Sequence, residues 1–99
     1  MDVSMQAIIT VVGKDQVGII AGISNMLADH HVNIVDITQS IVKDYFNMFM
    51  IVDLSKSTSS FKDIKDSFLK CEEELGVEIN FQRSEVFETM HRVSGVRHD

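Results

Sequence analysis

Residues 5–19 read "MQAIITVVGKDQVGI" and contain the change of pattern that decides the fold. Residues 5–12 are rich in Ile and Val and alternate with a period of two, which predicts a β-strand. The residues expected on its buried face are Ala7, Ile9 and Val11. Gly13 ends this run, and from Val17 the apolar residues follow a helical period. The sequence therefore predicts a strand that leads through a glycine-containing loop into a helix.

The first helix is predicted over residues 17–29. Its apolar positions at i, i+3 and i+7 share one helix face, and they are Ile20, Ile23 and Leu27. Asp15 precedes the helix and belongs to the residue types that cap helix N-termini, so we expect it to be the N-cap. His30 and His31 end the helix, where we expect both side chains to be solvated.

Two strands joined by a short turn are predicted next. Residues 32–42, "VNIVDITQSIV", predict a half-buried strand, and residues 46–54, "FNMFMIVDL", predict another after the turn "KDY". One face of the first strand is expected to hold Asn33, Val35, Ile37, Gln39 and Ile41. The second strand is apolar on both faces, so something must cover the second face as well.

The second helix has the clearest signal in the chain. Its apolar residues recur at spacings of three and four, and they are Phe61, Ile64, Phe68, Cys71 and Leu75. Ser60 with Asp63 resembles a capping box, and Gly76 is the expected C-terminal cap. Residues 77–82 then alternate as a strand, residues 84–93 predict a short amphipathic helix, and residues 94–99 form a polar tail.

This order of elements predicts a single α+β domain over residues 1–99 with a ferredoxin-like βαββαβ sandwich. Right-handed crossovers give an antiparallel sheet with strand order 4-1-3-2 and two helices on one face. The second face needs a cover, for which we expect the C-terminal helix and a second copy of the chain. The chain is therefore predicted to form a homodimer.

The composition excludes several classes of protein. The formal net charge is −6, and both halves of the chain carry more acidic than basic residues. Nucleic-acid binding and membrane-surface binding need basic surfaces, so neither is expected. The N-terminus opens acidic and no apolar stretch is long enough to cross a bilayer, so we expect a cytoplasmic protein.

No catalytic site, metal site or cofactor is predicted. Cys71 lies on the apolar helix face, where it is expected to be a buried small hydrophobe. Adjacent histidines such as His30 and His31 diverge on a helix, so they do not suit one metal ion. Asp63 and Asp66 lie beside lysines, which favours surface ion pairs over acid–base chemistry. The signatures of acylphosphatases, heavy-metal-binding domains and RNA-recognition domains, which share this fold, are missing.

The stretch "GKDQVGI", together with "VNI" at 32–34, resembles the ACT domain, a small-molecule-binding regulatory module of amino-acid-metabolism enzymes. The usual family pattern is Asp or Asn, Arg, Pro, Gly and a hydrophobic residue, followed by Asn-Ile at the second strand. The matching residues are Asp15, Gly18, Ile19, Asn33 and Ile34, and the departures are Gln16 and Val17. The resemblance covers residues 5–82 and is nearest to stand-alone, single-domain members.

The resemblance implies a ligand site formed by Asp15, Gln16, Val17, Gly18, Ile19, Asn33 and Ile34. In the family this site lies between the loop of one subunit and the second strand of its partner, which again implies a homodimer. Gly18 would let a carboxylate approach the first N–H groups of the helix, and Asp15 would receive an ammonium group. The expected function is thus a non-enzymatic regulatory domain that binds a small molecule, with an amino acid as the expected ligand.

The same residues also have purely structural explanations. Asp15 would then be only a helix cap, Gly18 a close-packing residue and Asn33 a turn residue. In that case the alternative function is a protein–protein assembly module that uses the open sheet face or the C-terminal helix, without a ligand. The sequence names neither the ligand nor a protein partner, and it leaves open whether dimers pair further.

Overall fold

The computed structural model describes residues 5–14 and 18–84. Its elements, in chain order, are β1 (Gln6–Lys14), α1 (Ile19–Asp29), β2 (Asn33–Val42), β3 (Tyr45–Asp53), α2 (Phe61–Leu75) and β4 (Glu78–Arg83). This order confirms the predicted βαββαβ pattern. The predicted C-terminal helix at 84–93 and the tail at 94–99 lie outside the described residues, apart from Ser84.

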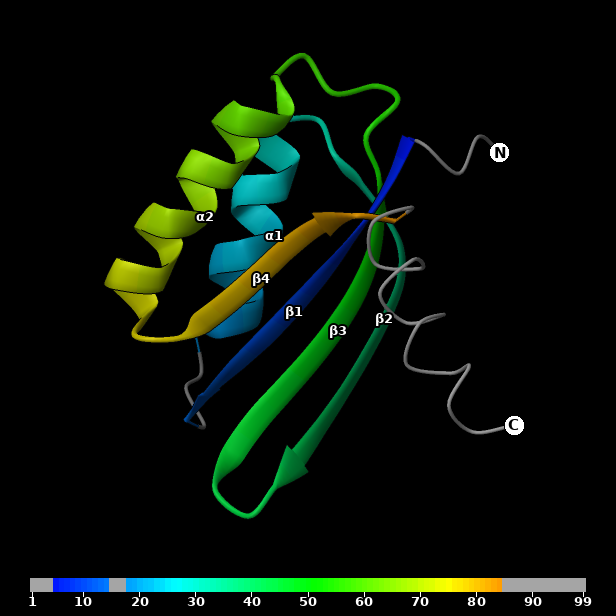
Figure 1. The fold of residues 1–99 in the computed structure, drawn as a ribbon. Helices are drawn as coiled ribbons and strands as arrows, with labels where there is room; N and C mark the ends of the chain where they lie inside the picture. Colours follow the sequence, from blue (N-terminus) through cyan, green and yellow to red (C-terminus); the bar gives the residue numbers. More distant parts are fainter. Residues whose placement is uncertain (1–4, 15–17, 85–99) are drawn as a thin grey trace, which may run out of the picture.

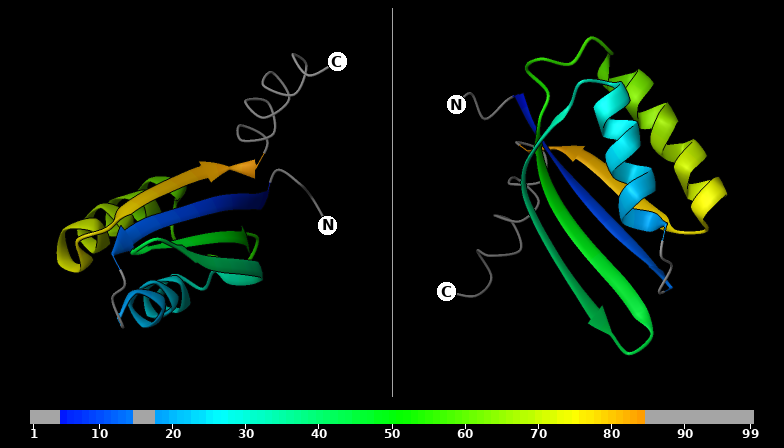
Figure 2. Two further views of the ribbon diagram at one scale, coloured as in Figure 1. Left: turned by 90° about the horizontal axis from the view of Figure 1, so that it is seen from below. Right: turned by 180° about the vertical axis from the view of Figure 1, so that it is seen from behind.

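The four strands form one antiparallel sheet in the order β2-β3-β1-β4, which is the predicted order 4-1-3-2. The two helices pack side by side on one face of this sheet, as Figures 1 and 2 show. β1 and β3 are central, whereas β2 and β4 are the edges. The ferredoxin-like α+β fold is therefore confirmed.

The core lies between the sheet and the helices. The predicted inward residues of β1, which are Ala7, Ile9 and Val11, are all fully buried. On α1 the prediction was wrong at one position, because Ile20 is 38% exposed and Ile19 is buried in its place. The buried residues of α1 are Ile19, Ile23 and Leu27. Their spacing of i, i+4 and i+8 places them on one face of the helix.

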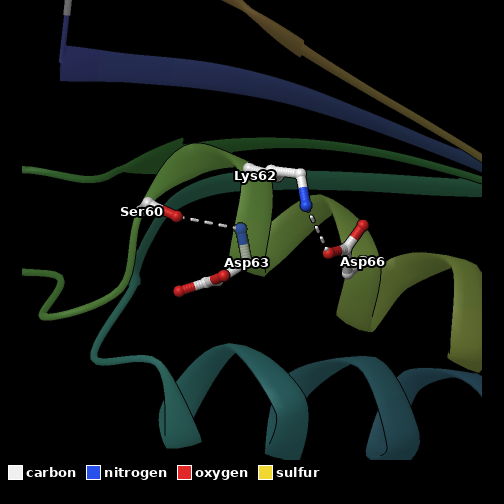
Figure 3. Close-up of polar contacts among 4 residues, drawn as sticks. All are labelled: Ser60, Lys62, Asp63 and Asp66. Atoms are coloured by element: carbon white, nitrogen blue, oxygen red, sulfur yellow. Dashed lines mark hydrogen bonds and ion pairs between the residues drawn. The ribbon is translucent and has the colours of Figure 1, made fainter.

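The helix ends follow local rules. α1 ends in a Schellman arrangement, in which Val32 N–H donates to the Leu27 carbonyl at 2.9 Å and His31 takes the left-handed conformation with φ 59°. At the start of α2 the Ser60 hydroxyl accepts a hydrogen bond from Asp63 N–H at 3.1 Å, as Figure 3 shows. Gly76, with φ 66°, ends α2 as predicted.

Gly13 marks the closest approach of β1 to the segment that precedes β4. A Cβ atom at this position would lie only 2.5 Å from Cγ1 of Val77, which is itself buried. Any larger residue at position 13 would push these two segments apart, because real Cβ contacts do not come this close. The glycine that ends the first apolar run is thus required for packing.

β2 differs from the prediction of a half-buried strand, since all ten of its residues are exposed. β2 is an edge strand that pairs with β3, and the hydrophobic core includes four residues of β3 but none of β2. A bulge between Ile34 and Asp36 also shifts the register, so that Asn33 and Ile37 lie on opposite faces. The predicted common face is therefore wrong for Asn33, whereas Ile37, Gln39 and Ile41 share one face as predicted.

Candidate functional site

The predicted ligand loop is the segment 15–19, and the structure describes the part of it at the start of α1. Asp15, Gln16 and Val17 lie outside the described residues, whereas Gly18 and Ile19 are described. Gly18 is the N-cap of α1, and no side chain forms a capping hydrogen bond there. The prediction that Asp15 is the N-cap was therefore wrong, because the helix begins at Ile19, several residues later than Asp15 requires.

Gly18 has neither of the two usual structural reasons for being glycine. Its φ of −85° is open to any residue. A Cβ at this position would meet no atom of the other described residues within 4 Å, its chain neighbours aside. Among the described residues, nothing packs closely against Gly18, in contrast to Gly13. The missing side chain instead leaves open space beside the first turn of α1.

The first turn of α1 is electrostatically suited to an anion. The first intrahelical bond at this end runs from Gly22 N–H to the Gly18 carbonyl at 2.8 Å. The N–H groups that precede Gly22 have no partner within the helix, and the first turn contains no acidic residue. Such N–H groups and the positive end of the helix dipole favour a bound carboxylate. Ile19, by contrast, points into the core and is fully buried.

Asn33 and Ile34 lie at the other end of the sheet. Asn33 is exposed and pairs with Asp53, which in turn pairs with Gln6 at the start of β1. Lys14, the last residue before the ligand loop, lies at the opposite end of β1. With about 3.3 Å per residue, these ends are roughly 25 Å apart. Within one chain, the structure does not bring Gly18 and Asn33 together.

β2 presents an apolar outer edge. Its exposed hydrophobic residues are Ile34, Val35, Ile37, Ile41 and Val42. The side of β2 that faces away from β3 pairs with no other strand of the sheet. A ten-residue apolar edge is an unusual surface for a monomer, because it can pair with another strand. This strand is therefore a candidate interface.

The described residues also bear on the catalytic possibilities. Cys71 is buried, as predicted, and its burial, followed by the nearby Glu74 carboxylate, raises the pKa of its thiol. Lys62 and Asp66 form the predicted surface ion pair at 3.5 Å (Figure 3). Within residues 5–14 and 18–84 no group of three His, Cys, Asp or Glu side chains is placed to hold a metal ion. In the same ranges no helix has the length and apolarity needed to cross a bilayer.

A histidine network was missed by the sequence reasoning. His30 is half-buried rather than solvated, with Nδ1 at 2.6 Å from Ser59 Oγ and Nε2 at 2.8 Å from Ser67 Oγ. Its carbonyl also accepts a hydrogen bond from Ser57 Oγ at 2.7 Å. These partners are distant in sequence, so only the fold reveals them. The Ser-rich composition of residues 55–60 was the available signal, and it predicted only a connection.

Comparisons with known proteins agree with the observed fold. A family model described as ACT domain matches residues 5–82. A UPF0237 protein of Listeria innocua is 47% identical over 89 residues, which are 90% of this chain and all of that protein. A UPF0237 protein of Clostridium acetobutylicum is 49% identical over 89 residues, which again are 90% of this chain and all of that protein. An ACT domain protein from Streptococcus pneumoniae has a solved structure with a TM-score of 0.74 and 41% identity, covering 86% of this chain and 96% of that one.

Proposed function

Because the chain belongs to the ACT domain family, whose members are small-molecule-binding regulatory modules, we propose that it binds an amino acid at the start of α1 in a homodimer. The observation that carries this proposal is Gly18. No backbone strain requires a glycine there, no other described residue packs against it, and the helix end has no side-chain cap, which leaves room for a ligand. An amino-acid carboxylate would fill this room and accept hydrogen bonds from the first N–H groups of α1.

The sheet register supports a site shared between two copies. If two β2 edges pair antiparallel about a twofold axis, the start of one β2 lies beside the end of the other. The end of β2, Val42, pairs with Tyr45, which pairs with Lys14 just before the ligand loop. Asn33 of the partner subunit would thus reach the end of the sheet where α1 begins. Dimerisation joins the two halves that a single chain keeps apart.

Asn33 and Asp15 would then complete the recognition of the amino acid. Asn33 offers both a donor and an acceptor, and Asp15 offers a carboxylate to the ammonium group. The module itself is non-enzymatic in this proposal and acts in the cytoplasm. Binding would stabilise the dimer relative to the free chains, and this difference in affinity between two states is what a regulatory response requires.

A thermal-shift screen against the common amino acids tests the proposal. A ligand at about 100 times its Kd stabilises the folded state by roughly 2.7 kcal/mol, and each kcal/mol raises Tm by about 4–8 °C in a domain of this size. Gly18→Leu is expected to abolish the shift, because its side chain fills the open space. Ala28→Leu, on the exposed surface of the same helix, should leave the shift unchanged. No shift with any amino acid at millimolar concentration would contradict the proposal.

A second candidate is a protein–protein assembly module without a ligand. The sheet face opposite the helices holds Val12, Phe49 and Ile51, of which Val12 is 40% exposed, whereas Ile8 on the same face is buried. A shallow pocket of about 230 Å³ lies on this face, between Val12, Thr38 and Phe49. For this function Val12→Lys would abolish assembly with a protein partner and Gly18→Leu would not, which distinguishes the two candidates.

A further inference from the structure

A second pocket lies at the end of the sheet farthest from the start of α1. It has a volume of about 270 Å³ and lies where the β3–α2 connection, the first turns of α2 and the end of β4 meet. A hydrogen bond from Leu54 N–H to the Met5 carbonyl, at 2.7 Å, closes this end of the sheet. The pocket shares no residue with the site proposed above.

The described lining of this pocket is basic, whereas the protein as a whole is acidic. The chain carries a net charge of −6, yet among the pocket residues that the structure describes the only ionisable side chain is Arg83. The Arg83 guanidinium lies over the Phe61 ring, 4.8 Å from its centroid. Among the described residues, no carboxylate forms an ion pair with Arg83. A guanidinium that has no acidic partner among the described residues favours anions.

The rest of the described lining combines four apolar residues, one of which is Met5, with three serines. Leu54, Phe61 and Ile64 form the apolar part, and Phe61 is fixed by stacking on Phe81 with ring centroids 4.5 Å apart. Ser57 and Ser59 form the polar part, together with Ser55. A ligand that suits both parts has a small apolar body and one anionic group.

Two serines of the pocket are held in place by His30, which follows the last residue of α1. His30 binds Ser59 Oγ through Nδ1, and the His30 carbonyl accepts from Ser57 Oγ. When the Nδ1 atom carries the proton, it donates to Ser59 Oγ, and the Ser59 hydroxyl hydrogen is then free to donate to a ligand. His30 is thus a positioning residue that pre-organises the connection before any ligand arrives.

We propose that this pocket is a second ligand site, which takes a small monocarboxylate with a short apolar side group. The carboxylate pairs with the Arg83 guanidinium and accepts from Ser59, while the apolar group rests on Leu54, Phe61 and Ile64. The volume is just below the roughly 300–1,000 Å³ of pockets for drug-sized ligands, so nucleotides are too large. The site is independent of the amino-acid site, since the two lie at opposite ends of the sheet.

Titration of the full chain with isovalerate and with phenylacetate, followed by amide NMR shifts, tests this proposal. Saturable shifts are expected around residues 54–64 and 83, and the neutral amides isovaleramide and phenylacetamide should produce none. Arg83→Gln should weaken binding by about tenfold or more, because it removes a charged hydrogen-bond donor. Arg83→Lys should restore part of the affinity, and Lys56→Gln, which removes an exposed charge outside the pocket, should not change it.

Several outcomes would overturn the second site. These are equal shifts with acids and amides, an unchanged affinity in Arg83→Gln, no saturable shift with either acid at millimolar concentration, and shifts confined to the start of α1. Inorganic phosphate binding as tightly as the two acids would also refute it, because the apolar part would then contribute nothing. Gly18→Leu separates the two proposals, since it should abolish the amino-acid response and leave carboxylate binding intact.

Discussion

The imidazole Nε2 of His30 lies 2.8 Å from Ser67 Oγ, and this contact joins the end of α1 to the middle of α2. The other ring nitrogen binds Ser59, so one side chain ties both helices to the connection between β3 and α2. Few other polar contacts in the described part of the chain span elements so far apart in sequence. The network therefore fixes how the two helices lie relative to each other.

Ser67→Ala is expected to lower the free energy of unfolding by about 1 kcal/mol, since it removes one half-buried hydrogen bond. His30→Ala removes both ring contacts and should have a larger effect, measured by urea denaturation. In the double variant the effects should not add, because the two residues act through one contact. Thr58→Ala, at an exposed position of the same connection, is the control and should be nearly neutral. Equal values for Thr58→Ala and Ser67→Ala would refute the role of His30.

Gly13→Ala and Gly18→Ala are the same chemical change with opposite expected results. At position 13 the new methyl group meets Val77 at 2.5 Å, and such overpacking typically lowers stability by about 1–3 kcal/mol. At position 18 the methyl group enters open space, so only a weak loss of N-cap preference, of about 0.5–1 kcal/mol, is expected. Denaturation midpoints check this difference, and a Gly18→Ala loss as large as that of Gly13→Ala would contradict it.

Lys43→Gly should stabilise the protein by up to about 1 kcal/mol. Lys43 lies in the turn between β2 and β3 with φ 58°, a left-handed conformation that is unfavourable for residues with a Cβ. Part of the gain is lost because glycine is more flexible in the unfolded chain. Asp44→Gly is the matched control, since Asp44 has no positive φ and its replacement should only destabilise. Thermal unfolding of both variants measures the difference.

Cys71 should be inert toward thiol reagents in the folded protein. Its side chain is buried, and its pKa lies above the ordinary value of 9.0, so little thiolate forms near neutral pH. Above pH 9 the unfolded chain loses this proton before the folded chain does, so stability should fall as the pH rises. Cys71→Ser, whose hydroxyl does not titrate there, should lose this part of the alkaline dependence. Rapid labelling of Cys71 without unfolding would argue against its burial.

Ile41→Lys should weaken the proposed dimer by roughly tenfold or more, because it places a charge on an edge strand and removes a large apolar contact. Ile41 is 60% exposed, so the chain itself should fold normally. Leu69→Lys, at a residue 56% exposed on α2, is the matched control and should leave the dimer intact. Sedimentation velocity over a concentration series distinguishes the two. A wild-type chain that stays monomeric at micromolar concentration would reject the dimer itself.

The sequence predicted the elements because their patterns are local. The alternation in β1 and the spacing from Phe61 to Leu75 each reflect one face packed against one core. Ile20 was misassigned because Ile19 and Ile20 are both apolar, and the spacing alone does not show which of them faces the sheet. The register of β2 was misassigned because the bulge at Val35 leaves no sign in the alternation of side chains.

The predicted ligand site remains a prediction, and the structure describes only part of it. The glycine pattern predicted a loop followed by a helix, and α1 begins at Ile19, directly after Gly18. The distance between Gly18 and Asn33 could not be predicted from their spacing in sequence, since it depends on which ends of the strands meet. The Arg83 pocket was not predicted, because its residues come from three separated segments that only the tertiary fold brings together.

If the homodimer proposed above forms through the β2 edge, the protein's response would depend on its own abundance. A binding site assembled from two copies exists only in the fraction of chains that have associated, so dilution removes sites even when ligand is plentiful. Association and ligand then strengthen each other by mass action. A cell that produces less of this chain would need a higher ligand level for the same occupancy, and the rate of synthesis would become a second input to the sensor.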